Sequence, residues 1–165
     1  LPIREREGEP FDRLRANGFC WAQSVTLVTL VRTPHSAAML GHISYGVCDL
    51  SRARLFYDAI MAALSYGRVD ADRRGVGYGQ AGTQMEQLLL RAVDRPVQLP
   101  GEGFHLCFDA PDRAAVDAFH AAGVAAGGID NGAPGLRPHY GPNYYAAFLF
   151  DPDGYRLEAK VVTGP

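Results

Sequence analysis

The chain has 165 residues, of which 47% are hydrophobic, and its formal net charge at pH 7 is −2. This length accommodates one domain or two small modules, and the charge balance excludes the basic field that attracts nucleic acids. Its three cysteines lack metal-binding spacing and do not form a complete disulfide framework, which favours a reducing, cytoplasmic location.

Residues 1–38 differ in composition from the rest of the chain and are predicted to form a loosely structured N-terminal extension. Their apolar run, residues 19–31, contains 13 residues, fewer than the roughly 20 that span a bilayer. We therefore expect that this run does not span a membrane. The folded domain is expected to comprise residues 39–165.

The next part of the chain alternates between strand and helix signals. In residues 40–47, His42 lies on the face opposite Ile43, Tyr45 and Val47, because side chains alternate with period two. Capping residues and an apolar stripe at helical spacing follow this strand. The elements expected for a first module, residues 40–93, are the strand 40–47, a helix from Asp49 that ends by Gly67, and strands near 75–79 and 84–91.

A Pro- and Gly-rich linker, residues 94–103, separates this module from a second one that repeats its order. His105 again lies opposite the bulky apolar side chains of its strand. The elements expected for the second module, residues 103–162, are the strand 103–109, a helix over 111–123, a long Gly/Pro-rich region over 126–143, and strands near 144–150 and 155–162. Loops as long as residues 126–143 usually have a function or are disordered, and this one is a candidate lid or substrate loop.

The two modules are related by an internal repeat with an offset of 63 residues. This offset aligns three pairs of residues: His42 with His105, Asp49 with Asp112, and Phe56 with Phe119. The chain therefore contains two copies of one strand-then-helix unit.

The second module ends in a strong turn sequence, Asp-Pro-Asp-Gly over residues 151–154, followed by an alternating strand. On that strand Leu157, Ala159 and Val161 share one face, whereas Glu158 lies on the other. Glu158 thus points away from the apolar face, as the two histidines do in their own strands.

Together these motifs resemble the vicinal oxygen chelate superfamily, which includes glyoxalase I, bleomycin-resistance proteins, fosfomycin-resistance enzymes and extradiol dioxygenases. The resemblance covers about residues 40–162. It rests on the histidine that opens each module, on the helix start DLSRARLFY at residues 49–57, and on the closing DPDG followed by Glu158.

The resemblance implies an α+β fold of two tandem βαβββ modules that form an incomplete curved barrel. It also implies that His42, His105 and Glu158 bind a divalent ion, namely Fe, Mn, Ni, Zn or Co. Two imidazoles and one carboxylate suit such ions and leave coordination positions open for substrate or water.

Further candidates for catalysis are one carboxylate and two residues of the segment PHYGPNYY, residues 138–145. Glu86 can act as a second ligand or general base if it faces the site, but a shift of one residue in register would place Gln87 there instead. His139 and Tyr145 are candidates for binding a polar substrate or transferring a proton.

These features predict a glyoxalase-type lyase or isomerase whose metal ion stabilises an enediolate-like anion of a small, oxygen-rich substrate. Two alternatives are an extradiol-type dioxygenase with an iron site of two histidines and one glutamate, and a resistance protein that binds a small molecule without catalysis. Family members of this length usually pair, so we expect a homodimer, with neither nucleic acid nor membrane as a partner.

Overall fold

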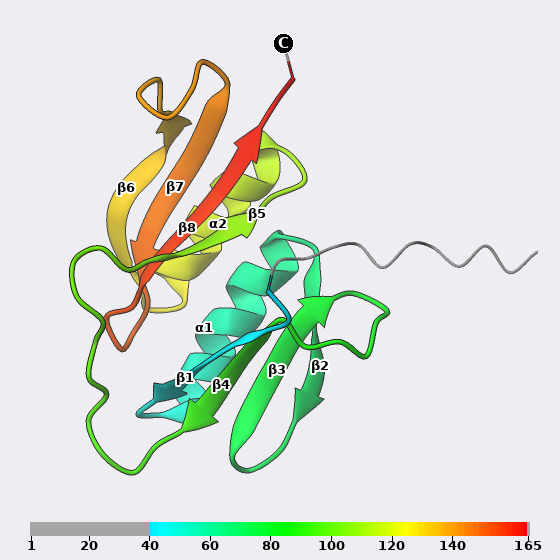
Figure 1. Ribbon diagram of the computed structural model, residues 1–165, viewed down its shortest axis with the longest axis vertical. Coiled ribbons are helices and arrows are strands. Elements are labelled where there is room, and N and C mark those ends of the chain that lie inside the picture. The colour runs from blue at the N-terminus through cyan, green and yellow to red at the C-terminus, as the bar shows by residue number, and fades with distance from the viewer. Residues whose placement is uncertain (1–39, 165) are drawn as a thin grey trace, which may run out of the picture. The chain divides into compact units, whose positions relative to one another are not determined.

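The computed structural model describes residues 40–164, which form two βαβββ modules joined by a linker (Figure 1). The predicted N-terminal extension, residues 1–38, and Met39 lie outside the described residues. The first module contains β1 (Ile43–Val47), α1 (Leu50–Ala63), β2 (Tyr66–Ala71), β3 (Gly75–Gln80) and β4 (Leu88–Ala92). The second contains β5 (Leu106–Asp109), α2 (Arg113–Ala125), β6 (Ile129–Leu136), β7 (Tyr144–Phe150) and β8 (Arg156–Val162).

Both sheets have the same topology. Their strand orders are β1-β4-β3-β2 and β5-β8-β7-β6, and in each sheet the first and last strands of the module pair in parallel while the other pairs are antiparallel. The predicted α+β fold of two tandem modules is confirmed. Within residues 40–164 the two sheets remain separate, so β1 and β5 are both edge strands and no closed barrel forms.

Both α1 and α2 begin at the aspartates that the repeat aligns. The carboxylate of Asp49 accepts hydrogen bonds from the amides of Ser51 and Arg52, and the carboxylate of Asp112 accepts one from the amide of Ala115. These contacts satisfy backbone N–H groups that the first helical turn leaves unpaired. None of the helices in this part of the chain is long and apolar enough to span a membrane.

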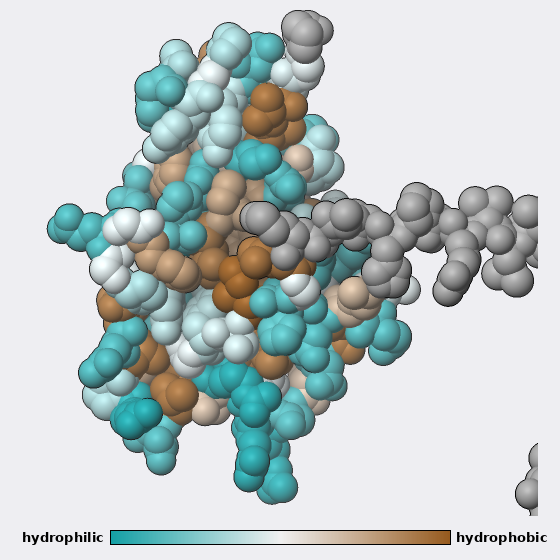
Figure 2. Space-filling view, in the orientation of Figure 1, coloured by the Kyte–Doolittle hydropathy of each residue, from teal (hydrophilic) through white to brown (hydrophobic). Residues whose placement is uncertain are grey.

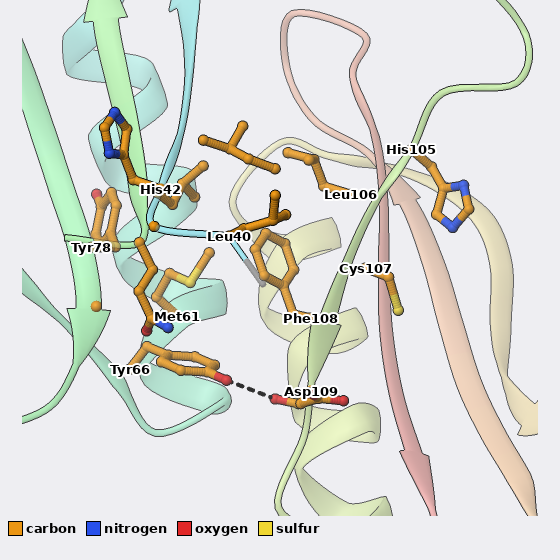
Figure 3. A pocket seen from close by; sticks show the side chains of 15 residues that line it. Leu40, His42, Met61, Tyr66, Tyr78, His105, Leu106, Cys107, Phe108 and Asp109 are labelled. Carbon is orange, nitrogen blue, oxygen red and sulfur yellow. Dashed lines mark hydrogen bonds between the residues drawn. The ribbon is translucent and has the colours of Figure 1, made fainter. Parts of the chain in front are cut away.

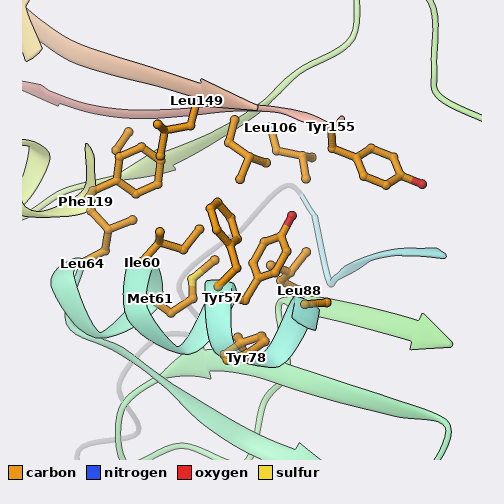
Figure 4. Packing of buried hydrophobic residues seen from close by; sticks show 14 of the residues in the cluster. Tyr57, Ile60, Met61, Leu64, Tyr78, Leu88, Leu106, Phe119, Leu149 and Tyr155 are labelled. Atoms are coloured by element: carbon orange, nitrogen blue, oxygen red, sulfur yellow. The ribbon is translucent and has the colours of Figure 1, made fainter. Parts of the chain in front are cut away.

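The core lies between the helices and the sheets (Figure 4). Phe56 of α1 and Phe119 of α2, which the repeat aligns, are both 0% exposed. Gly123 of α2 allows close packing, because a Cβ at this position would lie 3.2 Å from Ile60 Cγ2 and 2.2 Å from Leu149 Cδ1. The helices therefore pack against each other as well as against their own sheets.

Two strands, β2 and β6, are not predicted by the sequence. β2 follows α1 after Ser65, which has a left-handed φ of 65°, and β6 lies inside the region that was expected to be a long loop, residues 126–143. Both are edge strands, and β6 contains Pro134 and two glycines that conceal its alternation. Proline and glycine are tolerated at a sheet edge because an edge strand need not donate every N–H group to a neighbour.

The Asp-Pro-Asp-Gly turn has a second role, which is to join the modules. Asp151 is 2% exposed, and its Oδ2 accepts a hydrogen bond of 2.8 Å from the hydroxyl of Tyr57 in α1. The Tyr57 hydroxyl is also hydrogen-bonded, at 2.6 Å, to the hydroxyl of Tyr45 in β1. Burial is the main cause that raises the pKa of the Asp151 carboxyl and of both phenols.

Candidate functional site

Glu158 lies in the middle of β8 on the face of the second sheet that points away from α2. Its neighbours Leu157 and Ala159 face the helix and are buried, as the alternation predicted. Glu158 is nevertheless only 3% exposed. Its Oε2 lies 3.0 Å from His105 Nε2, and its Oε1 accepts a hydrogen bond of 2.8 Å from the hydroxyl of Tyr144. Both carboxylate oxygens therefore have partners.

Tyr144, rather than its neighbour Tyr145, is the tyrosine that contacts Glu158. The Tyr145 side chain lies on the opposite face of β7, where its hydroxyl donates a hydrogen bond of 2.8 Å to Asp117 of α2. Tyr145, which was a candidate for catalysis, thus faces the helix and not Glu158. The sequence could not resolve this because residues 146–150 are apolar on both faces of the strand.

Two groups beside Glu158 are kept in their protonated forms. Burial, together with the hydrogen bond to Glu158, raises the pKa of the Tyr144 phenol. Cys107 lies directly opposite Glu158 in the register of β5 and β8. Desolvation of its sulfur, followed by the nearby carboxylate, raises the pKa of the Cys107 thiol to about 12. Near neutral pH both groups are therefore neutral and can donate hydrogen bonds.

His139 belongs to the turn between β6 and β7 and is exposed. The centroid of its ring lies 4.0 Å from that of Tyr140, which in turn lies 5.2 Å from that of Tyr144. The three rings, tilted by 50° and 57° from one to the next, form a row that extends from the exposed turn to the tyrosine bonded to Glu158. His139 has no hydrogen bond to Glu158, but it lies at the outer end of this row.

His42 lies in the first module, just before β1, and lines a cavity of about 470 Å³ between the two modules. Figure 3 shows His42 and His105 on opposite sides of this cavity, with the His105 ring pointing away from it. Leu106 and Phe108 of β5, which His105 immediately precedes, point into the cavity instead. Apolar side chains also gather at the surface where the modules meet (Figure 2).

The fold thus brings His105 and Glu158 into contact, whereas His42 lies away from both of them. Across residues 40–164, no three side chains of His, Cys, Asp or Glu lie close enough together to hold a metal ion. The metal site of His42, His105 and Glu158 therefore stays a prediction, and within one chain only two of its three ligands meet.

The strand register identifies the position in the first module that corresponds to Glu158. Glu158 pairs with Cys107, whereas the equivalent pair in the first sheet is Leu89 with Ser44. The first module therefore carries leucine at this position. Neither Glu86 nor Gln87, the two residues that the sequence analysis considered, is the structural counterpart of Glu158.

Glu86 still reaches the face of the first sheet that points away from α1. A Cβ at Gly77 would lie 2.7 Å from Glu86 Oε2, and this Cβ would project away from the helix because Val76 and Tyr78 on either side are in the core. Gln87 instead lines the cavity. The carboxylate of Glu86 thus lies over Gly77, in the space that a side chain at this position would enter.

The chain matches the family model of the Glyoxalase/Bleomycin resistance protein/Dioxygenase superfamily over residues 39–159. A solved glyoxalase/bleomycin resistance protein from Albidiferax ferrireducens T118 is 32% identical, with a TM-score of 0.62, over 74% of this chain and 98% of that one.

A glyoxalase/bleomycin resistance protein/dioxygenase family enzyme from Burkholderia phytofirmans PsJN is 20% identical, with a TM-score of 0.57, over 74% of this chain and 98% of its own. A domain of the same description from Frankia sp. EAN1pec is 21% identical, with a TM-score of 0.56, over 78% of this chain and 94% of its own. These two likenesses concern the fold alone. No protein of curated function matches the chain.

Proposed function

Because the chain belongs to the glyoxalase/bleomycin resistance protein/dioxygenase superfamily, we propose that it is a divalent-metal-dependent enzyme of the glyoxalase type. Its substrate would be a small molecule with two vicinal oxygens. The observation that carries this proposal is the contact of 3.0 Å between His105 and the buried carboxylate of Glu158, on a sheet face that no helix of its own module covers.

The donors on this face fit a divalent ion. One imidazole nitrogen and one carboxylate oxygen are ligands that Fe, Mn, Ni, Zn and Co all accept, and the pair leaves coordination positions open. The Tyr144 hydroxyl bonded to the second carboxylate oxygen is an orienting contact of the kind that tunes metal ligands. His105 and Glu158 would therefore form one half of a metal site.

The first module supplies the matching half. Glu86 lies at the corresponding sheet face of this module. His42, which lines the cavity between the modules, would have to reach this face in the assembled site. In a homodimer with a two-fold axis, the half-site of one copy would meet the complementary half-site of the other, which gives two shared sites. The edge strands β1 and β5 support this arrangement, since unpaired strand edges need covering.

In such a site the residues of the chain would have separate tasks. The ion, when bound, would polarise the vicinal oxygens of the substrate. Glu86, placed over Gly77, would remove a proton from the carbon next to the carbonyl group. Tyr144, kept neutral by its raised pKa, would hold the Glu158 carboxylate in place through its hydrogen bond. His139, at the outer end of the row of aromatic rings, would return a proton from solvent to the neighbouring carbon of the substrate, and Glu86 would then release its own proton to solvent.

The first experiment measures metal content in protein purified without added ions. We expect His105→Ala and Glu158→Gln to lose most of the metal, while the control His120→Ala keeps it, because His120 pairs with Asp130 away from this face. Undiminished metal in both site variants would refute the proposal. Activity then separates the two kinds of chemistry. Turnover of the hemithioacetal of methylglyoxal and glutathione would indicate a glyoxalase. Cleavage of a catechol that depends on Fe(II) and O₂ would indicate a dioxygenase. Tight binding of a small molecule without turnover would indicate a resistance protein.

The second experiment tests whether the site is shared. Neither His42→Ala nor Glu158→Gln chains should hold metal in their own homodimers. When equal amounts are mixed and allowed to exchange, each mixed dimer would contain one intact site, so about a quarter of all sites should recover. Sedimentation equilibrium gives the assembly mass. A species that stays at the 17.9 kDa of one chain and still holds metal would exclude the shared site.

A further inference from the structure

Arg137 is a cationic side chain on the same sheet face as Glu158 that the proposed chemistry does not use. It follows β6 and lies opposite Tyr144 across the hairpin, since its amide donates a hydrogen bond of 2.8 Å to the Tyr144 carbonyl. Its guanidinium lies 5.4 Å from the ring centroid of Phe148, and Phe148 pairs with Glu158 in the register of β7 and β8. The cation thus lies over the strand next to the one that carries Glu158.

The glycines of β6 leave room for this guanidinium. A Cβ at Gly135 would lie 3.1 Å from Arg137 Nη1, and one at Gly132 would lie 3.5 Å from Arg137 Nη2 and 3.1 Å from Phe148 Cδ2. A side chain at Gly135 would crowd the cation, and one at Gly132 would crowd the ring of Phe148. The glycines that conceal β6 in the sequence therefore have a local role, which is to leave room for the guanidinium beside the strand.

Arg137 has hydrogen-bond donors to spare. Its Nη2 donates to the carbonyl of Ala133 at 2.6 Å and its Nη1 to the carbonyl of Leu136 at 3.4 Å, whereas a guanidinium has five N–H groups. In the part of the chain that the structure describes, no carboxylate pairs with Arg137, although the neighbouring cation on this face, Lys160, pairs with Asp109. Arg137 is thus held in place by neutral carbonyls and keeps its positive charge uncompensated.

We propose that Arg137 binds a carboxylate group of the substrate, so that the enzyme acts on small anionic molecules that carry vicinal oxygens. This inference rests on the proposed function, because it assigns the substrate of that site. A planar guanidinium forms paired hydrogen bonds with a carboxylate, and an aromatic ring beneath it restricts its orientation. The substrate would extend from the half-site of His105 and Glu158 toward β6, with its charged end on Arg137.

The test compares pyruvate with pyruvamide, which share their shape and their vicinal oxygens but differ in charge. Dissociation constants are measured by NMR titration of protein stripped with a chelator, so that the carboxylate has no ion to bind instead. We expect pyruvate to bind about tenfold more tightly than pyruvamide, the difference that one charge-assisted contact supplies. Arg137→Gln should remove this preference without weakening pyruvamide, and Arg137→Lys should keep only part of it.

Arg113→Gln is the matched control, because the Arg113 guanidinium lies 5.1 Å from the ring centroid of Tyr145 on the helix face of the same sheet. The inference is overturned if the wild-type protein shows no preference for pyruvate, if Arg137→Gln retains the preference, or if Arg113→Gln loses it equally. Metal content of Arg137→Gln, measured in parallel, should equal that of the wild-type protein. If the wild-type protein never binds metal but still prefers pyruvate to pyruvamide, the metal site is refuted and the role of Arg137 is retained.

Discussion

Replacing Tyr57 with phenylalanine removes one hydroxyl from the contact between the two modules. This hydroxyl donates a hydrogen bond of 2.8 Å to Asp151 and meets the hydroxyl of Tyr45 at 2.6 Å. Without it, one oxygen of a carboxyl group that is 2% exposed loses its partner. Hydrogen bonds to charged groups contribute about 1.5–3 kcal/mol, and the unpaired Tyr45 hydroxyl adds about 1 kcal/mol. We expect Tyr57→Phe to lower the free energy of unfolding by about 3 kcal/mol, and Tm by about 10 °C.

The assay is chemical unfolding followed by circular dichroism, with Tyr45→Phe as the matched control. The control also loses a hydroxyl from the network but leaves the bond from Tyr57 to Asp151 in place, so it should cost only about 1 kcal/mol. The double variant should cost about as much as Tyr57→Phe alone, because the two hydroxyls act through one chain of hydrogen bonds. The reasoning is wrong if Tyr57→Phe destabilises the protein no more than Tyr45→Phe does.

Three further predictions concern packing and pH. Gly123→Ala should lower the free energy of unfolding by about 1–3 kcal/mol, although alanine favours helix, because its Cβ would lie 2.2 Å from Leu149 Cδ1; an unchanged or raised Tm would contradict the packing of α2. Burial raises the folded-state pKa of Asp151, so the wild-type protein should lose stability relative to Asp151→Asn as pH rises from about 4; parallel urea midpoints for the two proteins between pH 4 and 7 would exclude this. The raised pKa values of buried Tyr45 and Tyr57 should make the folded state lose stability above about pH 10. Complete titration of all eight phenols without unfolding, followed by absorbance, would be inconsistent with the burial of these two.

Sequence periodicity and repetition were sufficient to predict the elements that carry the core. Phe56 and Phe119 occupy equivalent buried positions, and Asp49 and Asp112 cap equivalent helices, as the repeat implied. The face of Glu158 also followed from the alternation in β8. These features depend on neighbours within a few residues, so local sequence contains the information.

Other features depend on contacts that the local sequence does not specify. Tyr144 and Tyr145 could not be distinguished because the residues after them are apolar on both faces of β7. The position of Glu86 depends on Gly77 in the adjacent strand. Asp151 was recognised only as a turn residue because its partner Tyr57 is 94 residues away.

The buried contact of Asp151 with Tyr57 has a geometric consequence for the candidate site. The turn that contains Asp151 leads directly into β8, so the first module determines where the strand of Glu158 begins. His42, immediately before the strand that precedes α1, and Glu158 are therefore positioned by the same anchor. In the proposed homodimer, a partner that aligned with one half-site would automatically align with the other. Both shared sites would then form in a single assembly step, and a substitution in the anchor would misalign the two together.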